Sequence, residues 1–224
     1  MYKHDTPCGP LVLAASDTGI TICSFADLDT VRARYPTTAG TGTKPAERTP
    51  YSTARELDAL DGEPRLGTKN ESGASAPPLR GDGETGRGDQ PVRGSGGAAT
   101  IVEWARRELN AYFAGDLRRF TVPVDLRYSN AFDRSILTGL STVDYGETTT
   151  YGALARTLNL PTTAARGVGG AMAGNPVLVI VPCHRVLGVD GALVGYAGGL
   201  GVKRRLLDLE TADRFPQLDL LFSA

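Results

Sequence analysis

A run of six residues, Val181 to Val186 (VPCHRV), places a thiol, an imidazole and a guanidinium side by side after an apolar stretch. Cys183 supplies the thiol, and a thiol attacks carbon only as the thiolate. A neighbouring base such as His184 and a positive charge such as Arg185 favour that form. The run therefore indicates a nucleophilic cysteine, although a Cys beside a His is more often a small core residue next to a solvated ring.

Residues on both sides of this run favour the nucleophile. Asn175-Pro176 precedes it, Gly195 to Gly199 (GYAGG) follows it, and Lys203 to Glu210 closes the segment. Together they resemble the O6-alkylguanine-DNA alkyltransferase family, also called methylated-DNA–protein-cysteine methyltransferases. The resemblance runs from about residue 132 to 210 and is weaker in the N-terminal part.

This resemblance implies direct-reversal DNA repair. The partner would be double-stranded DNA that contains O6-alkylguanine, and the alkylated base must be flipped out of the stack before its alkyl carbon can be reached. Cys183 would accept the alkyl group, His184 would take the thiol proton through a bridging water, and Glu210 would orient His184. Because the product is a stable thioether, we expect one irreversible transfer per molecule, without a cofactor.

The resemblance also implies roles around the nucleophile. Tyr196 would protonate or hydrogen-bond a guanine ring nitrogen, and Asn175 would brace the turn that leads into an active-site strand. Many relatives carry Ser or Thr where Ala197 stands, and Ala197 is similar to the constitutive bacterial type, so the range of alkyl groups and the repair of O4-alkylthymine stay open. The substrate pocket is expected at Val186, Ala197, Gly198 and Gly199.

Two short helices precede the run and form a helix-turn-helix candidate. Thr150 can cap a helix that reaches Leu158, and after a turn at Asn159 to Pro161 a second helix is predicted over about 163–173. In the family the second helix enters the minor groove. The resemblance implies that Arg166 there replaces the flipped base.

Small residues crowd the second helix. Glycine is costly inside a helix, so they indicate close approach to another surface, either DNA or the protein's own scaffold. Tyr151, at the start of the first helix, matches a tyrosine that pushes the 3′ phosphate in the family, although it stands one residue further from Arg166 than in most relatives. The DNA-contacting residues are expected to be Tyr151, Arg166, Ala164, Ala165, Gly167 and Gly169.

Apolar spacing predicts further elements. A helix is expected over residues 132–140, where Leu137 stands in place of a common family Trp and one face carries Phe132, Ile136, Leu137 and Leu140. Near the N-terminus, residues 11–15 and 20–25 alternate as a hairpin. A capping box from Thr100 to Glu103 predicts a helix that ends at Gly115, with Leu109 and Tyr112 among the apolar residues at helical spacing, and residues 120–126 resemble an edge strand.

The overall expectation is an α/β (α+β) protein of two domains. Residues 1–127 would form a small N-terminal α/β domain, and residues 128–224 a mainly helical alkyl-acceptor domain. Residues from about 37 to 98 are rich in Gly, Pro, Ser and charges, which predicts a disordered insertion. A formal net charge of −1 argues against DNA binding through a broad basic surface.

Several alternatives remain at this stage. Cys8 and Cys23 are read as buried core residues, and with His4 they lack a familiar zinc spacing, so no metal is expected. The cytoplasm is the expected location, since no apolar span or secretion signal is recognised. A monomer is also expected. A non-catalytic module that recognises alkylated DNA, or a thiol hydrolase or redox sensor built on Cys183 and His184, are the competing functions.

Overall fold

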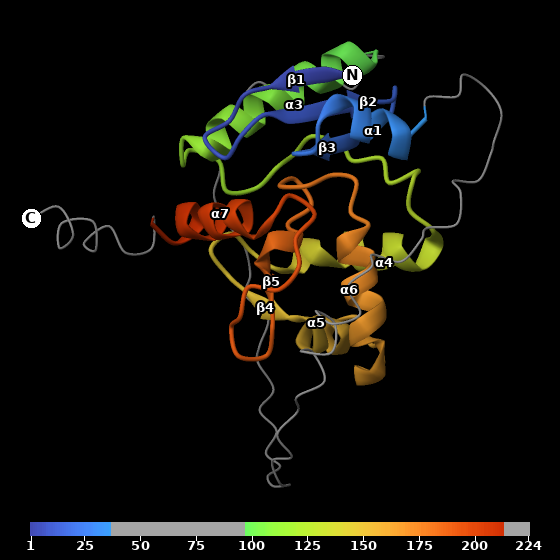
Figure 1. Cartoon of the computed structure of the whole chain (residues 1–224), viewed down its shortest axis with the longest axis vertical. Helices are drawn as coiled ribbons and strands as arrows, with labels where there is room; N and C mark the ends of the chain where they lie inside the picture. The colour runs from blue at the N-terminus through green and yellow to red at the C-terminus, as the bar shows by residue number, and fades with distance from the viewer. Residues whose placement is uncertain (37–96, 213–224) are drawn as a thin grey trace, which may run out of the picture.

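The computed structural model describes residues 1–36 and 97–212 (Figure 1). An antiparallel sheet and the helices of the N-terminal part occupy the upper half of the view, and the helices that follow residue 130 the lower half. The predicted disordered insertion falls almost entirely on residues outside this description. Within the described part, no helix combines the length and apolar character needed to cross a membrane.

The N-terminal sheet contains the predicted hairpin. β2 (Leu11–Ala15) pairs antiparallel with β3 (Ile20–Ser24), and Ser16 N donates to Gly19 O at 2.9 Å in the turn between them. A further strand, β1 (Tyr2–His4), was not predicted and pairs with β2, which gives the order β1-β2-β3.

Two helices accompany this sheet. α1 (Leu28–Arg34) was not predicted, although Asp27 caps it by accepting from two backbone N–H groups. α3 (Ala98–Phe113) packs on β2 and ends before Gly115 as expected, but the predicted capping box is wrong. The helix begins two residues before Thr100, with Gly97 as N-cap and no side-chain cap, because the good helix formers at 98 and 99 extend the first turn.

The predicted edge strand at residues 120–126 is also wrong. Val124 makes an isolated parallel bridge with Ile20, and the chain then turns away. The Asp125 carboxylate accepts hydrogen bonds from Ser16 Oγ at 2.8 Å and Arg127 Nε at 2.7 Å. These side-chain bonds hold a turn where further ladder pairing would have continued.

The C-terminal part is mainly helical. The Thr150 side chain accepts from Ala153 N at 3.2 Å, as its predicted capping role requires. α6 packs on both α4 and α5. The elements in order are α4 (Ala131–Gly139), β4 (Thr149–Thr150), α5 (Tyr151–Thr157), α6 (Ala165–Ala173), β5 (Val186–Leu187) and α7 (Leu200–Ala212), with β4 and β5 paired in parallel.

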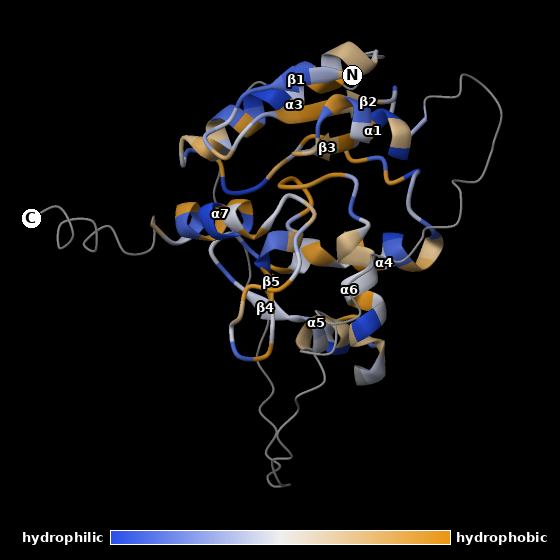
Figure 2. Ribbon diagram, in the orientation of Figure 1, coloured by the Kyte–Doolittle hydropathy of each residue, from blue (hydrophilic) through white to orange (hydrophobic). Residues whose placement is uncertain are grey.

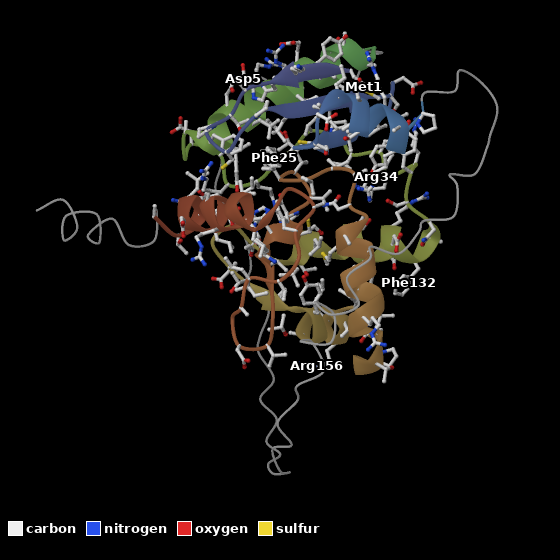
Figure 3. The ribbon with its side chains drawn as sticks, in the orientation of Figure 1. Met1, Asp5, Phe25, Arg34, Phe132 and Arg156 are labelled. Carbon is white, nitrogen blue, oxygen red and sulfur yellow. The ribbon has the colours of Figure 1, made fainter. Side chains whose placement is uncertain are left out.

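One residue of the apolar face predicted for α4 is not buried in the structure. Ile136, Leu137 and Leu140 are buried as expected, but Phe132 is 42% exposed. Its ring lies beside Gly167 of α6, at the outer edge of the helix pair, as its label in Figure 3 shows. Phe132 sits in the first turn of α4, where the helix has not yet reached the core.

The buried core is continuous between the two halves of the molecule. One apolar cluster includes Leu13 and Leu109 of the upper half together with Leu137, Val168 and Leu206 of the lower half. In Figure 2 apolar colouring marks β3 and the loop directly below it. The α+β class is therefore confirmed, whereas a domain boundary at residue 127 stays a prediction.

Candidate active site

Cys183 lies on a tight turn and not at the end of a strand. Residues Cys183–Arg185 form one 3-10 turn, and before it Val177 makes an isolated bridge with Cys23 of β3. The expected active-site strand is wrong because the backbone bonds here are local: Val181 N donates to Val177 O at 3.0 Å. Val179 in this turn has φ +70°, a conformation that a β-branched residue rarely adopts.

Asn175 joins this turn to the nucleophile. Its Oδ1 accepts from Val177 N at 2.9 Å, and its Nδ2 donates to Val181 O at 3.1 Å. The same Nδ2 lies 3.1 Å from the Sγ of Cys183 and donates to it. A bracing residue thus also supplies a hydrogen bond that favours negative charge on the sulfur.

The sulfur is well shielded from solvent. Cys183 is 4% exposed, and burial raises the pKa of its thiol to about 11, against the opposing effects of the Asn175 hydrogen bond and the Lys203 charge. At neutral pH the thiol therefore keeps its proton. A nearby base is required before the sulfur can act as a nucleophile.

His184 has one ring nitrogen engaged and one available. Nε2 lies 2.8 Å from Glu210 Oε1, while the buried Nδ1 has no hydrogen-bond partner among the described residues. An ionised carboxylate only accepts, so Nε2 carries the hydrogen and Nδ1 the lone pair. Burial lowers the pKa of His184 despite the neighbouring Glu210, which keeps the imidazole neutral and able to take a proton.

Glu210 on α7 accepts hydrogen bonds from several polar groups of the site. Burial alone would raise its pKa, but the hydrogen bond from His184, followed by the hydrogen bond and charge of Arg185, lowers it to about 2. Arg185 donates through Nε to Oε2 and through Nη2 to Oε1, both at 2.9 Å, and Nη1 donates to Val143 O at 2.7 Å. Gly146 N adds a bond to Oε2 at 3.1 Å. The carboxylate is therefore ionised and fixed in position.

Lys203 is a buried residue of the site to which the sequence analysis gave no role. Its Nζ donates to Val186 O at 2.6 Å and to Val194 O at 2.8 Å, which ties the loop after the nucleophile to α7. Burial lowers its pKa to about 8, with Cys183 acting in the opposite direction. The signal was its spacing, because Lys203 shares the buried face of α7 with Leu206 and Glu210.

Tyr196 brings a hydroxyl to the same region. Its ring stands edge-on to His184 with 6.4 Å between centroids, and its buried hydroxyl has no hydrogen-bond partner within the described chain. Burial, followed by the proximity of Cys183, raises the pKa of Tyr196 well above its usual value. The phenol is therefore protonated and able to donate to a ligand.

The expected pocket residues differ in their exposure. Val186 is buried and its carbonyl accepts from Lys203 Nζ, whereas Ala197 and Gly199 are exposed. A Cβ added to Gly198 would lie 2.7 Å from the Tyr196 ring and 2.8 Å from the Phe25 ring, so only glycine fits between them.

The expected DNA-contacting residues fall into two groups. Arg166 and Gly167 are exposed on α6, while Ala164, Ala165 and Gly169 are half-buried. Tyr151 instead is 7% exposed, and its hydroxyl donates to Val194 O at 3.4 Å. Burial, followed by the proximity of Cys183, raises its pKa to about 12. Tyr151 thus faces the nucleophile and not the outer surface of α6.

No group of three or more His, Cys, Asp or Glu side chains that could hold a metal ion occurs within residues 1–36 and 97–212. Cys8 and Cys23 are both buried thiols, consistent with their interpretation as core residues.

Residues 131–212 match the family model described as the DNA binding domain of 6-O-methylguanine DNA methyltransferase. The methylated-DNA–protein-cysteine methyltransferase of Mycobacterium tuberculosis (strain H37Rv) is 50% identical over 103 residues, which cover 46% of this chain and 61% of the relative. That of Methanosarcina acetivorans is 47% identical over 106 residues, or 47% of this chain and 67% of the relative. The matched part thus spans less than two thirds of the length of the mycobacterial protein.

Solved structures resemble a larger part of the chain. The crystal structure of Mycobacterium tuberculosis O6-methylguanine methyltransferase has a TM-score of 0.60 at 30% identity, over 98% of this chain and 96% of that one. Mycobacterium tuberculosis OGT in complex with DNA gives the same TM-score and identity over 94% and 91%. With its nucleophile turn, its buried carboxylate network and these likenesses, the chain belongs to the family of methylated-DNA–protein-cysteine methyltransferases.

Proposed function

We propose that this protein repairs double-stranded DNA by moving the alkyl group of O6-alkylguanine onto its own Cys183, once per molecule. The observation that carries the proposal is the pairing of a buried thiol, held by Asn175, with a neutral His184 whose Nδ1 is available and whose Nε2 is fixed by Glu210. The activity for which the relatives are named and the DNA complex of a structural neighbour support the same reaction class.

The reaction follows from these groups. The thiol proton passes to His184 Nδ1 through a bridging water, and the thiolate attacks the alkyl carbon in line with the bond to O6. The C–S bond forms as the C–O6 bond breaks, and the guanine takes up a proton, for which Tyr196 is the donor. The imidazolium formed on His184 then returns its proton to Tyr196 through water, so the proton lost by the thiol equals the one gained by guanine. The thioether has no leaving group, so the site is not regenerated.

Access to the base is assigned to α6. Its exposed Arg166 would occupy the place of the flipped base, while the small residues around it would allow close approach to the minor groove. The burial of Tyr151 beside the nucleophile supports a contact with the flipped nucleotide at the pocket rather than with a phosphate outside it. The monomeric state and the cytoplasmic location stay predictions.

The test mixes the protein with duplex DNA that carries one O6-methylguanine and measures intact mass and peptide masses, with Cys183→Ser as control. One added methyl group on Cys183 and restored guanine in the DNA are expected. Tight binding without transfer would instead favour a recognition module. Neither binding nor transfer, together with ester hydrolysis or reaction with peroxide, would favour a thiol hydrolase or redox sensor.

A further inference from the structure

A buried hydroxyl from the opposite half of the molecule reaches the carboxylate of the active-site network. Tyr112, in the last turn of α3, donates to Glu210 Oε1 at 2.7 Å across 98 positions of sequence. In Figure 1 the end of α3 lies directly above α7. A residue that the apolar spacing assigned to the core therefore contacts the relay itself.

The geometry makes Tyr112 a fixed donor. Its side chain is fully buried, and its ring packs edge-on against Phe113 and Tyr145, with centroids 5.2 Å and 5.9 Å away. Burial, followed by the charge of Glu210, raises the pKa of Tyr112 well above its usual value, so the phenol keeps its hydrogen. An acceptor-only carboxylate leaves one direction for the bond, from Tyr112 to Glu210.

The oxygen that Tyr112 contacts is the one that holds His184. Oε1 accepts from Tyr112 at 2.7 Å, from His184 Nε2 at 2.8 Å and from Arg185 Nη2 at 2.9 Å. Each donor withdraws electron density from the shared oxygen, so each lowers its basicity toward the others. The bond from Tyr112 therefore weakens the pull of Glu210 on the Nε2 hydrogen.

We propose that Tyr112 is a positioning residue of the alkyl-transfer relay, which fixes Glu210 Oε1 and limits how basic that carboxylate makes His184. This inference rests on the proposed function and assigns the N-terminal half a part in it. The bond from Tyr112 keeps the His184 imidazole neutral and able to accept the thiol proton. Without that bond, the Glu210 carboxylate would stabilise the protonated form of His184 more strongly.

Other charged and titratable groups lie around His184 besides Tyr112. Glu210 and Lys203 face it from α7, Arg185 and Cys183 from its own turn, and Tyr196 from the loop that precedes α7. Removal of the Tyr112 hydroxyl alone leaves all of these in place. Tyr145→Phe is the matched control, because its hydroxyl lies in the same aromatic cluster but contacts Leu209 O at 3.4 Å instead of Glu210.

The first test does not depend on activity. The chain has two histidines, His4 and His184, so 15N-histidine labelling gives two ring spin systems, with His4 as internal reference. In Tyr112→Phe the Nε2 proton of His184 is expected to move downfield, since its bond to Oε1 strengthens, and the midpoint of its titration to move to higher pH. Wild type and Tyr145→Phe should agree. An unchanged His184 signal in Tyr112→Phe would overturn the proposal.

The second test measures single-turnover methyl transfer across the acid range. The acid limb of the rate profile is expected at higher pH in Tyr112→Phe than in wild type and Tyr145→Phe, a change that a loss of stability alone would not produce. A wild-type protein that transfers nothing would defeat the proposed function while the NMR comparison still tests Tyr112. If Tyr112→Phe fails to fold, 3-fluorotyrosine at this position keeps the ring and donates more strongly, so both shifts must reverse in sign; the same sign would overturn the proposal.

Discussion

At the scale of single residues, Cys183 combines two opposing demands. Burial protects the thiol by holding its pKa near 11, yet the Asn175 hydrogen bond and the neighbouring Lys203 partly counter that effect. The sulfur is therefore inert toward random oxidants and electrophiles in bulk water but placed beside donors that favour the thiolate during transfer. Reactivity depends on a few named contacts.

The contribution of the Asn175 donor can be measured. Asn175→Ala removes the bond from Nδ2 to Sγ, and a hydrogen bond to a charged group contributes about 1.5 to 3 kcal/mol, so single-turnover transfer should slow roughly 10- to 100-fold. Asn175→Asp keeps the acceptor for Val177 N but not the donor, and should be slow as well. The exposed Asn110→Ala is the control. A wild-type rate in both Asn175 variants would exclude this role.

The Glu210 carboxylate makes the free energy of unfolding depend on pH in the acid range. Its folded-state pKa, about 2, lies below the ordinary value of 4.5, so its ionisation stabilises the fold above about pH 4.5, and this contribution is lost as the pH falls toward 2. The shift corresponds to about 3 kcal/mol. Urea unfolding should show wild type more stable than Glu210→Gln near pH 7 by about 3 to 5 kcal/mol, with the gap smaller by about 2 kcal/mol at pH 3.

The exposed Glu103→Gln serves as the control for this titration, because the Glu103 side chain is 62% exposed in its pairing with Arg106. It should follow wild type at every pH. A gap between wild type and Glu210→Gln that stays constant with pH would contradict the assignment.

At the scale of elements, the glycines in the helices are present for two different physical reasons. A Cβ at Gly139, the last residue of α4, would lie 2.4 Å from the Leu158 side chain, whereas a Cβ at Gly170 in α6 would meet nothing within 4 Å. Packing therefore explains Gly139 but not Gly170. Gly167 is intermediate, with the Phe132 ring 3.2 Å from a Cβ. The small residues of α6 are consistent with approach to a surface outside the chain.

The two glycines give opposite predictions. Gly139→Ala should destabilise the protein by about 1 to 3 kcal/mol because of the clash, while Gly170→Ala should stabilise it by about 0.5 to 1 kcal/mol through helix propensity. Urea unfolding of both variants measures these changes. If α6 approaches DNA closely, Gly170→Ala should nevertheless bind duplex DNA more weakly. Equal binding by wild type and Gly170→Ala would remove this reason for its small residues.

Local signals in the sequence were sufficient for several elements. The turn at Ser16 to Gly19 predicted the hairpin, and Thr150 predicted the start of α5, because both depend on neighbours within a few residues. The strand at 120–126 failed since Asp125 bonds to Ser16 and Thr18, more than a hundred positions away. Apolar alternation could not reveal that competition.

Prediction of the site divides in the same way. Cys183, His184 and Glu210 were nominated by residue type and resemblance, and the structure joins His184 to Glu210 on the turn that carries Cys183. Tyr112 was expected only as a core residue, because a pattern of apolar positions does not show where a buried hydroxyl points. An active-site strand was expected after Asn175, whereas the chain there makes local turn bonds such as that from Val181 N to Val177 O.

At the scale of the whole molecule, the site lies inside the continuous core, so product formation should affect global stability. A methyl group on the buried Sγ enlarges a packed side chain, which costs about 1 to 3 kcal/mol and lowers the Tm by roughly 2 to 10 °C. Calorimetry of the protein before and after reaction with methylated duplex DNA measures the change, with Cys183→Ser carried through the same treatment. Equal Tm values for the reacted and unreacted protein would refute the prediction.

The bond between Tyr112 and Glu210 also has a consequence for the order of events during folding. Glu210 is 26 positions from His184 and 98 from Tyr112, so the network closes only after contacts of long sequence separation have formed. A partly folded chain already contains the thiol but not the groups that draw off its proton. In the proposed function, the capacity for a single irreversible reaction is thus withheld until the two halves of the protein have come together.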